Sequence, residues 1–311
     1  MHFSFFDLHC DTATELFRHG QRLERNTLAV SLEKAKDFDR WTQVMAIWTD
    51  HTLDDENGWQ RCLDVLAYLC ADPAVQNGRA QITTNAKESG ASLFLSVEDA
   101  RILNQKTERI YTLYDQGIRI ITPLWSGETC MGGSHDTKSG LTAFGKEALT
   151  EALRLGITLD VSHASLASAD QIFELSAKQG RPVMASHSNA FSVCPVSRNL
   201  SDQQIRDILA LNGVIGLNLY QRFLSVGEKP SRWDVLRHVE YFLEQGCENA
   251  LCFGCDMDGA ELPEDLHDLS SIPSLREFLA DYYDGKILDQ LFFQNAYHFA
   301  ERAFGSSAEN L

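Results

Sequence analysis

Short apolar runs recur along this chain, and polar segments with helical spacing separate them. Several of the runs are almost continuously apolar, which is typical of parallel strands that are buried on both faces. Eight of them predict β-strands, over residues 3–8, 43–48, 91–96, 118–123, 157–162, 182–186, 213–219 and 250–255.

Helix signals lie between these runs. Ser201 and Asp202 precede a segment, 203–211, whose apolar residues recur at helical spacing. Two further predicted helices, 146–155 and 231–245, are each followed by a glycine and lead into a predicted strand. A helix that delivers the chain into the next strand is the βα repeat.

Eight strands joined in this way within 311 residues predict an α/β fold, a (β/α)8 TIM-like barrel. An open doubly wound sheet is the alternative, but no G-x-G-x-x-G motif follows the first predicted strand. The polar segment 50–87, with a helical core at 59–71, is interpreted as an insertion after strand two, and residues 274–304 as C-terminal helices. We expect one domain over residues 1–311.

Composition excludes several classes of partner. The chain has 27 Lys and Arg against 44 Asp and Glu, a formal charge of −17, which argues against binding to nucleic acid or to an anionic membrane. It has no apolar run of about 18 residues and no secretion signal, so we expect a cytoplasmic protein. Cys252-x-x-Cys255 has no second pair and is interpreted as strand-core thiols.

Ionisable residues follow the predicted strands. His9 and Asp11 come at the end of the first run, and two residues spaced i, i+2 in a strand point to the same face. Catalytic residues of a TIM barrel lie at the carboxyl ends of its strands. The other residues that follow strands in this way are Glu98, His163, His187 and Asp256.

Each of these residues has an ordinary explanation when taken alone. A single histidine after a strand is more often structural, and Glu98 could simply cap the next helix. Taken together, three histidines, one Asp and one Glu can hold two divalent metal ions if Glu98 bridges them. Asp256 is then interpreted as the group that carries the proton, whereas Asp258 is interpreted as part of a turn and His238 as a structural histidine.

In these residues and the motifs around them the chain resembles the membrane (renal) dipeptidase-like family of zinc peptidases, in its bacterial cytosolic branch. The motifs that carry the resemblance occur in the family's order and span residues 7 to 259. They are Asp7-Leu8-His9-Cys10-Asp11-Thr12, Ser96-Val97-Glu98-Asp99-Ala100, Leu159-Asp160-Val161-Ser162-His163-Ala164-Ser165, Ala185-Ser186-His187-Ser188-Asn189-Ala190, Ser197-Arg198-Asn199 and Gly254-Cys255-Asp256-Met257-Asp258-Gly259.

The resemblance implies two zinc ions in a TIM-like barrel. One would be bound by His9, Asp11 and Glu98, and Glu98 would bridge the two ions. Because of this bridging position we count Glu98, with Asp256, among the catalytic residues. The other would be bound by Glu98, His163 and His187. The resemblance also implies that Arg198 meets the C-terminal carboxylate of the substrate, and a guanidinium matches a carboxylate bidentately.

One position departs from the family. Its peptidases commonly carry Thr-His after strand four, where the histidine helps to bind the substrate carbonyl. Here Trp125 takes that position, in Thr122-Pro123-Leu124-Trp125. An indole N–H can donate one hydrogen bond but cannot become a cation. We expect Trp125 to line the substrate pocket, and the glycine-rich run 127–134 to form an active-site loop.

The expected function is a dizinc-dependent dipeptidase that hydrolyses short peptides with a free C-terminal carboxylate through a metal-bridging hydroxide. Its partner would be a small peptide substrate, and it could form a homodimer. One alternative keeps the metal site but acts as an amidase or deacylase on N-acyl or D-configured amino acids. Another, which Trp125 favours, is a family member that binds metal or ligand without catalysis.

Overall fold

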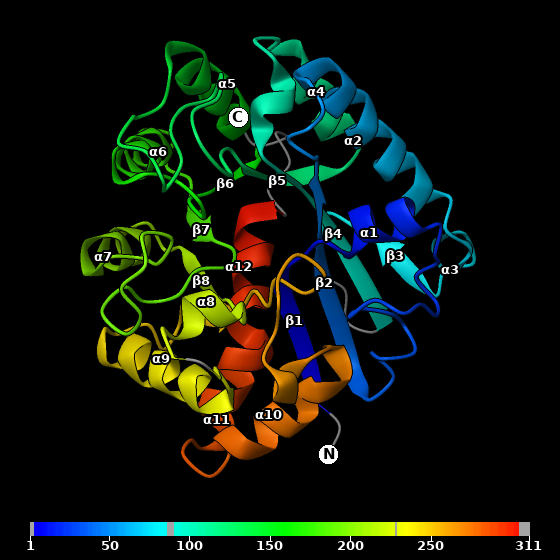
Figure 1. Ribbon diagram of the computed structural model, residues 1–311, viewed down its shortest axis with the longest axis vertical. Helices are drawn as coiled ribbons and strands as arrows, with labels where there is room; N and C mark the ends of the chain where they lie inside the picture. Colours follow the sequence, from blue (N-terminus) through cyan, green and yellow to red (C-terminus); the bar gives the residue numbers. More distant parts are fainter. Residues whose placement is uncertain (1–2, 86–89, 228, 305–311) are drawn as a thin grey trace.

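The computed structural model describes residues 3–85, 90–227 and 229–304. Within these ranges one parallel sheet contains nine strands, in the order β2-β1-β9-β8-β7-β6-β5-β4-β3, and β2 also pairs with β4. This additional pairing closes eight of the strands into a barrel with helices around it (Figure 1). The predicted TIM-like barrel is therefore confirmed, and the open sheet is excluded.

Each of the eight predicted strands is present. The largest shift is at the start of β2, which begins at Phe38 instead of residue 43. The ninth strand, β3, was not predicted; it has only three residues and pairs with β4 outside the barrel ring. The strands are β1 Phe3–Cys10, β2 Phe38–Trp48, β3 Ala80–Ile82, β4 Gly90–Glu98, β5 Ile118–Thr122, β6 Thr158–Asp160, β7 Val183–Ala185, β8 Val214–Leu217 and β9 Leu251–Phe253.

The predicted helices are also present, and their ends carry the expected signals. Ser201 forms a capping box at the start of α7, and Gly156 ends α5 in a left-handed conformation. The α-helices are α1 Thr12–His19, α2 Asp55–Cys70, α3 Pro73–Gln76, α4 Glu108–Asp115, α5 Ala143–Leu155, α6 Leu166–Lys178, α7 Asp202–Ala210, α8 Gln221–Leu224, α9 Arg232–Glu244, α10 Ile272–Leu279, α11 Gly285–Asp289 and α12 Asn295–Phe304.

Short helical turns complete the chain trace. They are η1 Ala100–Leu103, η2 Glu264–Leu266, η3 Leu269–Ser271 and the π-helical η4 Gln290–Gln294. The predicted insertion after strand two contains α2, α3 and β3, while its last two residues, 86 and 87, lie outside the described residues. None of the helices in the described ranges has the length and apolar character needed to cross a lipid bilayer.

The C-terminal helix α12 lies against the interior of the barrel (Figure 1). The ring of Phe304 is 5.1 Å from that of Phe94 in β4, and the ring of Phe293 in η4 is 6.3 Å from that of Phe6 in β1. These strand residues precede His9 and Glu98 in their strands, so α12 covers the barrel end opposite those residues. One buried cluster joins strand residues Phe6, Leu8, Val44, Phe94, Ile120, Met184, Val214 and Cys252 to Phe293, Ala296, Phe299, Ala300, Ala303 and Phe304.

The cysteines are packing residues in this structure. All eight are free thiols, and Cys252 and Cys255 have no exposed surface. Burial, the largest cause, raises the pKa of both thiols well above the ordinary range, so they stay protonated. This agrees with the interpretation of the Cys-x-x-Cys pair as core thiols.

His238 is fully buried in α9, as expected for a structural histidine. Its Nδ1 accepts a hydrogen bond from the backbone N–H of Ala190 at 3.2 Å, and its Nε2 donates to the carbonyl oxygen of Leu224 at 3.0 Å. Nδ1 therefore has to stay unprotonated. Burial, the largest cause, lowers the pKa of His238 to about 4.

We predict that His238 makes the fold sensitive to acid. An unfolded histidine titrates near pH 6.5, so between pH 6.5 and 4 the unfolded chain binds a proton that the folded chain refuses, and stability falls as the pH falls. Between pH 7 and 5 this protonation lowers the free energy of unfolding by about 2 kcal/mol. In urea unfolding, the free energy of unfolding of H238Q should fall less than that of the wild type between pH 7 and 5, and the difference should be that amount. The exposed control H267Q should match the wild type. An equal loss in H238Q would contradict the prediction.

Candidate active site

The residues proposed from the sequence converge at the carboxyl ends of the barrel strands. His9 lies near the end of β1 with Asp11 just after it, and Glu98 is the last residue of β4. His163, His187 and Asp256 lie two or three residues beyond β6, β7 and β9. Asp11, Glu98, His163 and Asp256 line a cavity of about 710 Å³, and His9 and His187 are buried next to it with 1% of their surface exposed.

Glu98 stands between two groups of nitrogen and oxygen atoms. Its Oε1 is 3.0 Å from Nε2 of His163 and 3.4 Å from Nε2 of His187. Its Oε2 is 3.5 Å from Nε2 of His9, which is also 3.5 Å from Oδ2 of Asp11. The two carboxylate oxygens thus face two different clusters, which is the arrangement that a bridging ligand needs.

The tautomers of His163 and His187 follow from their other ring nitrogens. Nδ1 of His163 donates to the carbonyl oxygen of Trp125 at 3.0 Å. Nδ1 of His187 donates to Ser186 Oγ at 2.6 Å, because that hydroxyl itself donates to Asp160 Oδ2. Both Nε2 atoms therefore carry lone pairs, and they are only 2.9 Å apart.

Two lone pairs at that distance repel each other unless a cation lies between them. Two ligand atoms bound tetrahedrally to one zinc ion lie roughly 3.4 Å apart, since each is about 2.1 Å from the metal. The separations around Glu98 range from 2.9 to 3.5 Å. His9 Nε2, Asp11 Oδ1 and Glu98 Oε1 are moreover buried without a hydrogen-bond partner in the described part of the chain. The donor set fits divalent metal ions.

The electrostatics of His163 and His187 agree with this fit, whereas the carboxylates of Glu98 and Asp11 outweigh the effect of burial and raise the pKa of His9 well above its ordinary value. Burial, followed by the charge of Arg198, lowers the pKa of His163 to about 4. Burial, followed by the charge of His9, lowers the pKa of His187 well below its ordinary value. Both rings are therefore neutral at neutral pH, the form in which imidazole binds a metal ion.

Asp256 lies beside the two clusters and is held from behind. Its backbone adopts a left-handed conformation, φ 62°, and its Oδ2 accepts a hydrogen bond from Asn218 Nδ2 at 2.9 Å. Its other oxygen, Oδ1, is 3.9 Å from Nε2 of His9. With His9 and His187 it also forms a third group whose ligand atoms all lie within 4.8 Å of one another. The geometry therefore allows Asp256 either to handle protons or to bind a metal ion.

Burial, the largest cause, raises the pKa of Asp256 to about 7; the carboxylates of Asp11 and Glu98 act in the same direction, against His9 and Asn218.

Asp258, in the same loop, has a different place. Its two carboxylate oxygens accept hydrogen bonds from Thr12 Oγ1 and from the backbone N–H of Ala29, each at 2.6 Å. It therefore ties this loop to the segment after β1.

Arg198 is buried, with 4% of its surface exposed, and so is not a surface arginine. Its Nη1 donates to Ser188 Oγ at 2.8 Å and its Nη2 to the carbonyl oxygen of His187 at 2.9 Å. Its Nε has no hydrogen-bond partner among the described residues. The guanidinium lies 5.4 Å from the ring of Phe223, which lines the cavity. Arg198 is thus fixed in place and still has a free N–H.

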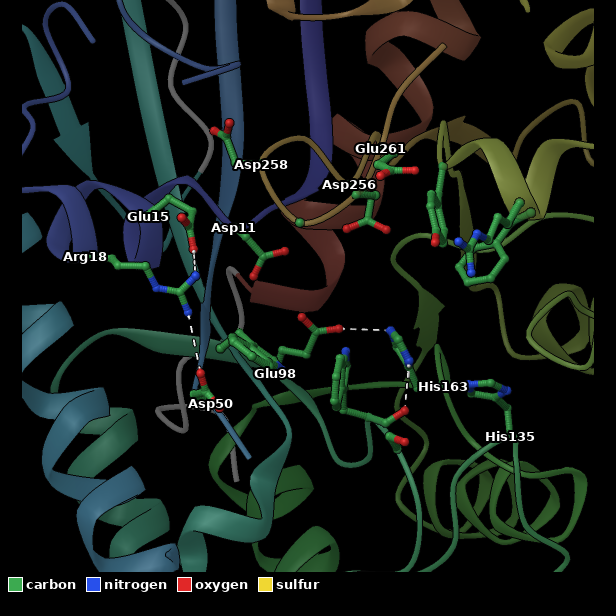
Figure 2. A pocket seen from close by; sticks show the side chains of 18 residues that line it. Asp11, Glu15, Arg18, Asp50, Glu98, His135, His163, Asp256, Asp258 and Glu261 are labelled. Carbon is green, nitrogen blue, oxygen red and sulfur yellow. Dashed lines mark hydrogen bonds and ion pairs between the residues drawn. The ribbon is translucent and has the colours of Figure 1, made fainter. Parts of the chain in front are cut away.

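Trp125 lines the cavity, as expected. Its ring lies 5.1 Å from that of Trp48 and 4.7 Å from that of His51, while its carbonyl oxygen accepts the hydrogen bond from His163. Trp48 and Trp125 together form an aromatic wall on one side of the cavity. Figure 2 shows Glu98 and His163 pointing toward each other, with Asp11 and Asp256 nearby.

The residues that hold the others in place were not predicted from the sequence. Asp160 accepts from the backbone N–H groups of Ser162 and Ser186, both at 2.9 Å, and so joins the ends of β6 and β7. Asn218 positions Asp256, and His135 lines the cavity. A usable signal existed for Asn218, because it directly follows a barrel strand; His135 lies on a long loop and offered none.

Known proteins resemble this chain over most of its length. A family model described as membrane dipeptidase (peptidase family M19) matches residues 1–306. An uncharacterised protein of the pqqA 5′ region of Klebsiella pneumoniae is 31% identical over 257 residues, 76% of this chain and 92% of that protein. Dipeptidase aclJ of Aspergillus oryzae is 32% identical over 145 residues, 46% of this chain and 34% of that protein.

Two solved structures share the whole fold. The crystal structure of dipeptidase AC, a metallopeptidase of family M19, has a TM-score of 0.90 and 26% identity and covers 98% of this chain and 99% of its own. A metallopeptidase from Rhodobacter sphaeroides, bound to a phosphinate mimic of the dipeptide L-Ala-D-Ala, has a TM-score of 0.89 and 25% identity and covers 97% of this chain and 99% of its own.

Proposed function

This chain belongs to the membrane dipeptidase family, peptidase family M19, and is a metal-dependent peptide hydrolase; from that premise we propose that it is a dizinc dipeptidase acting on dipeptides with a free C-terminal carboxylate. In this proposal a single barrel domain holds one zinc ion with His9, Asp11 and Glu98 and the other with Glu98, His163 and His187. The observation that carries the proposal is the position of Glu98, whose two carboxylate oxygens face two separate sets of ligands.

The metal ions would polarise the scissile carbonyl and lower the pKa of a water molecule placed between them. Asp256 removes a proton from that water and returns it to the leaving amine. Asn218 supports this role, because its hydrogen bond holds one oxygen of Asp256 and leaves the other free. A carboxyl group positioned in this way can take up a proton in one step and release it in the next.

Arg198 supplies the selectivity for a free carboxylate. It is buried, charged and already held by two hydrogen bonds, so little side-chain freedom is lost when a substrate binds. The N–H groups that these two hydrogen bonds do not use would bind the substrate carboxylate. Trp48 and Trp125 form the aromatic wall against which a substrate side chain packs.

The stereochemistry of the second residue is suggested by a relative. Because the R. sphaeroides metallopeptidase was crystallised with a phosphinate mimic of L-Ala-D-Ala, we propose L,D-dipeptides as the first substrates to test. The same zinc site could serve a deacylase of N-acyl amino acids, and substrate comparison separates the two functions.

The test combines metal analysis with a substrate panel on the purified protein. We expect two zinc ions per chain and hydrolysis of L-Ala-D-Ala or L-Ala-L-Ala, with the dipeptide carboxamide cleaved at least about tenfold more slowly, since it lacks the charge that Arg198 binds. Cleavage of N-acetyl-alanine alone would identify a deacylase. Bound zinc without any turnover would identify a non-catalytic binding protein, and protein without metal would contradict the dizinc site.

A further inference from the structure

The loop between β5 and α5 brings His135 to the edge of the cavity. The backbone N–H of His135 donates to the carbonyl oxygen of His163 at 2.7 Å, and the two rings lie 6.0 Å apart. In Figure 2, His135 lies beyond His163 as seen from Glu98 and Asp256. His135 thus stands next to the proposed metal ligands without belonging to any of the three groups of potential ligands in the described residues.

The loop holds His135 in a defined position. Asp136 accepts hydrogen bonds from the backbone N–H of Gly127 at 2.9 Å and from Ser126 Oγ at 3.0 Å, which closes the base of the loop. Its turns are tightly packed, because a Cβ atom on Gly133 would come within 2.6 Å of the carbonyl oxygen of Ser139. The main-chain position of His135 is therefore set before any ligand arrives.

The side chain of His135 links this loop to the Arg198 segment. Its Nδ1 lies 3.0 Å from the hydroxyl of Ser197, the residue before Arg198. Its Nε2 makes no hydrogen bond to any described residue, although the ring is half-buried and lines the cavity. The ring is close enough to Arg198 for the charge of the guanidinium to act on it.

We propose that His135 binds the C-terminal carboxylate of the substrate together with Arg198, a contact that rests on the dipeptidase function proposed above. Two of the N–H groups of Arg198 are already held by Ser188 and His187, one from each terminal nitrogen, so a second donor beside it would strengthen the hold on the two carboxylate oxygens. An imidazole that accepts the Ser197 hydroxyl hydrogen at Nδ1 presents an N–H at Nε2 for the second oxygen.

The spacing of the site suits a dipeptide. In a dipeptide the terminal carboxylate lies one residue, about 3.6 Å, beyond the scissile carbonyl. The ring of His135 lies 6.0 Å from that of the proposed metal ligand His163. A longer peptide would place an uncharged amide where the carboxylate should be, so His135 and Arg198 together would restrict the enzyme to dipeptides.

The test is a comparison of acid and amide ligands. The metal-loaded wild type, H135A and the control H298A, which lies on α12 far from the cavity, would be titrated by calorimetry with a phosphinate dipeptide mimic and with its C-terminal carboxamide. H135A lacks one hydrogen bond to the charged carboxylate, so it should bind the mimic with a free carboxylate about 10- to 100-fold more weakly than the wild type does. Its binding of the carboxamide should change less than about threefold. The corresponding dipeptide should show a raised KM with little change in kcat.

R198M is expected to lose the same preference for the acid. Equal weakening of acid and amide in H135A, no weakening of either, or a wild type without preference for the acid would overturn the role of His135. A wild type that cleaves no dipeptide would instead contradict the proposed function, and the binding comparison would still decide whether His135 recognises a carboxylate.

Discussion

D256N should retain its metal and its fold while kcat falls by about a thousandfold, within the range of about 10² to 10⁴ that a positioned acid–base group contributes. An amide at this position keeps the volume and one hydrogen-bond acceptor for Asn218, but it cannot take a proton from water or return it to the departing amine. The loss should therefore appear in kcat rather than in KM.

Metal content gives this prediction its control. The geometry also groups Asp256 with His9 and His187 as possible ligands. Elemental analysis of D256N separates the two roles, because a variant that loses zinc would show Asp256 to be a ligand. Full activity in D256N would remove both roles. D64N, a surface change on α2, is the matched control and should behave as the wild type.

E98Q should have the largest effect on the metal content of the protein. Glutamine keeps the shape of the side chain but offers only one oxygen, and its NH₂ group cannot bind a metal ion. It can therefore face one cluster but cannot bridge both. We expect at least one zinc ion per chain to be lost and activity to fall by more than about a thousandfold, since both metal ions act on the same reacting atoms.

Thermal unfolding provides a second measure of this prediction. A metal ion that binds only the folded state raises Tm, and a chelator reverses that effect. The wild type should lose several degrees of Tm in EDTA and regain them with added zinc, whereas E98Q should show a smaller change. E174Q, an exposed change on α6, should respond as the wild type does. Two zinc ions and near-normal turnover in E98Q would show that Glu98 is not a bridge.

The sequence predicted the barrel because its signals are local. Each parallel strand is a short apolar run, and the helices α5, α7 and α9 carry glycines or capping residues at their ends. Once the strand ends are known, the carboxyl-end rule brings together residues as distant as His9 and Asp256. The strand β3 was missed because a run of only three residues carries no periodic signal.

The supporting residues of the site could be predicted less well. In the sequence Asp160 is an ordinary strand residue. Only the structure shows that its carboxylate accepts hydrogen bonds from the backbone beyond both β6 and β7. His135 reaches the cavity only through the hydrogen bonds of a long loop, and no repeat or spacing in the sequence encodes that path. The motif residues were predictable because they adjoin strands, and these were not because tertiary contacts place them.

The position of α12 has a consequence for how the protein is made. The aromatic residues of β1 and β4 leave the ribosome early, but their partners Phe293 and Phe304 emerge almost three hundred residues after Phe6 and some two hundred after Phe94. For most of its synthesis a nascent chain would lack α12, and the apolar residues at this end of the barrel would be exposed to solvent. We therefore expect this protein to depend on chaperones that bind nascent chains during translation. Premature termination just before α12 should yield aggregated protein instead of a shorter active enzyme.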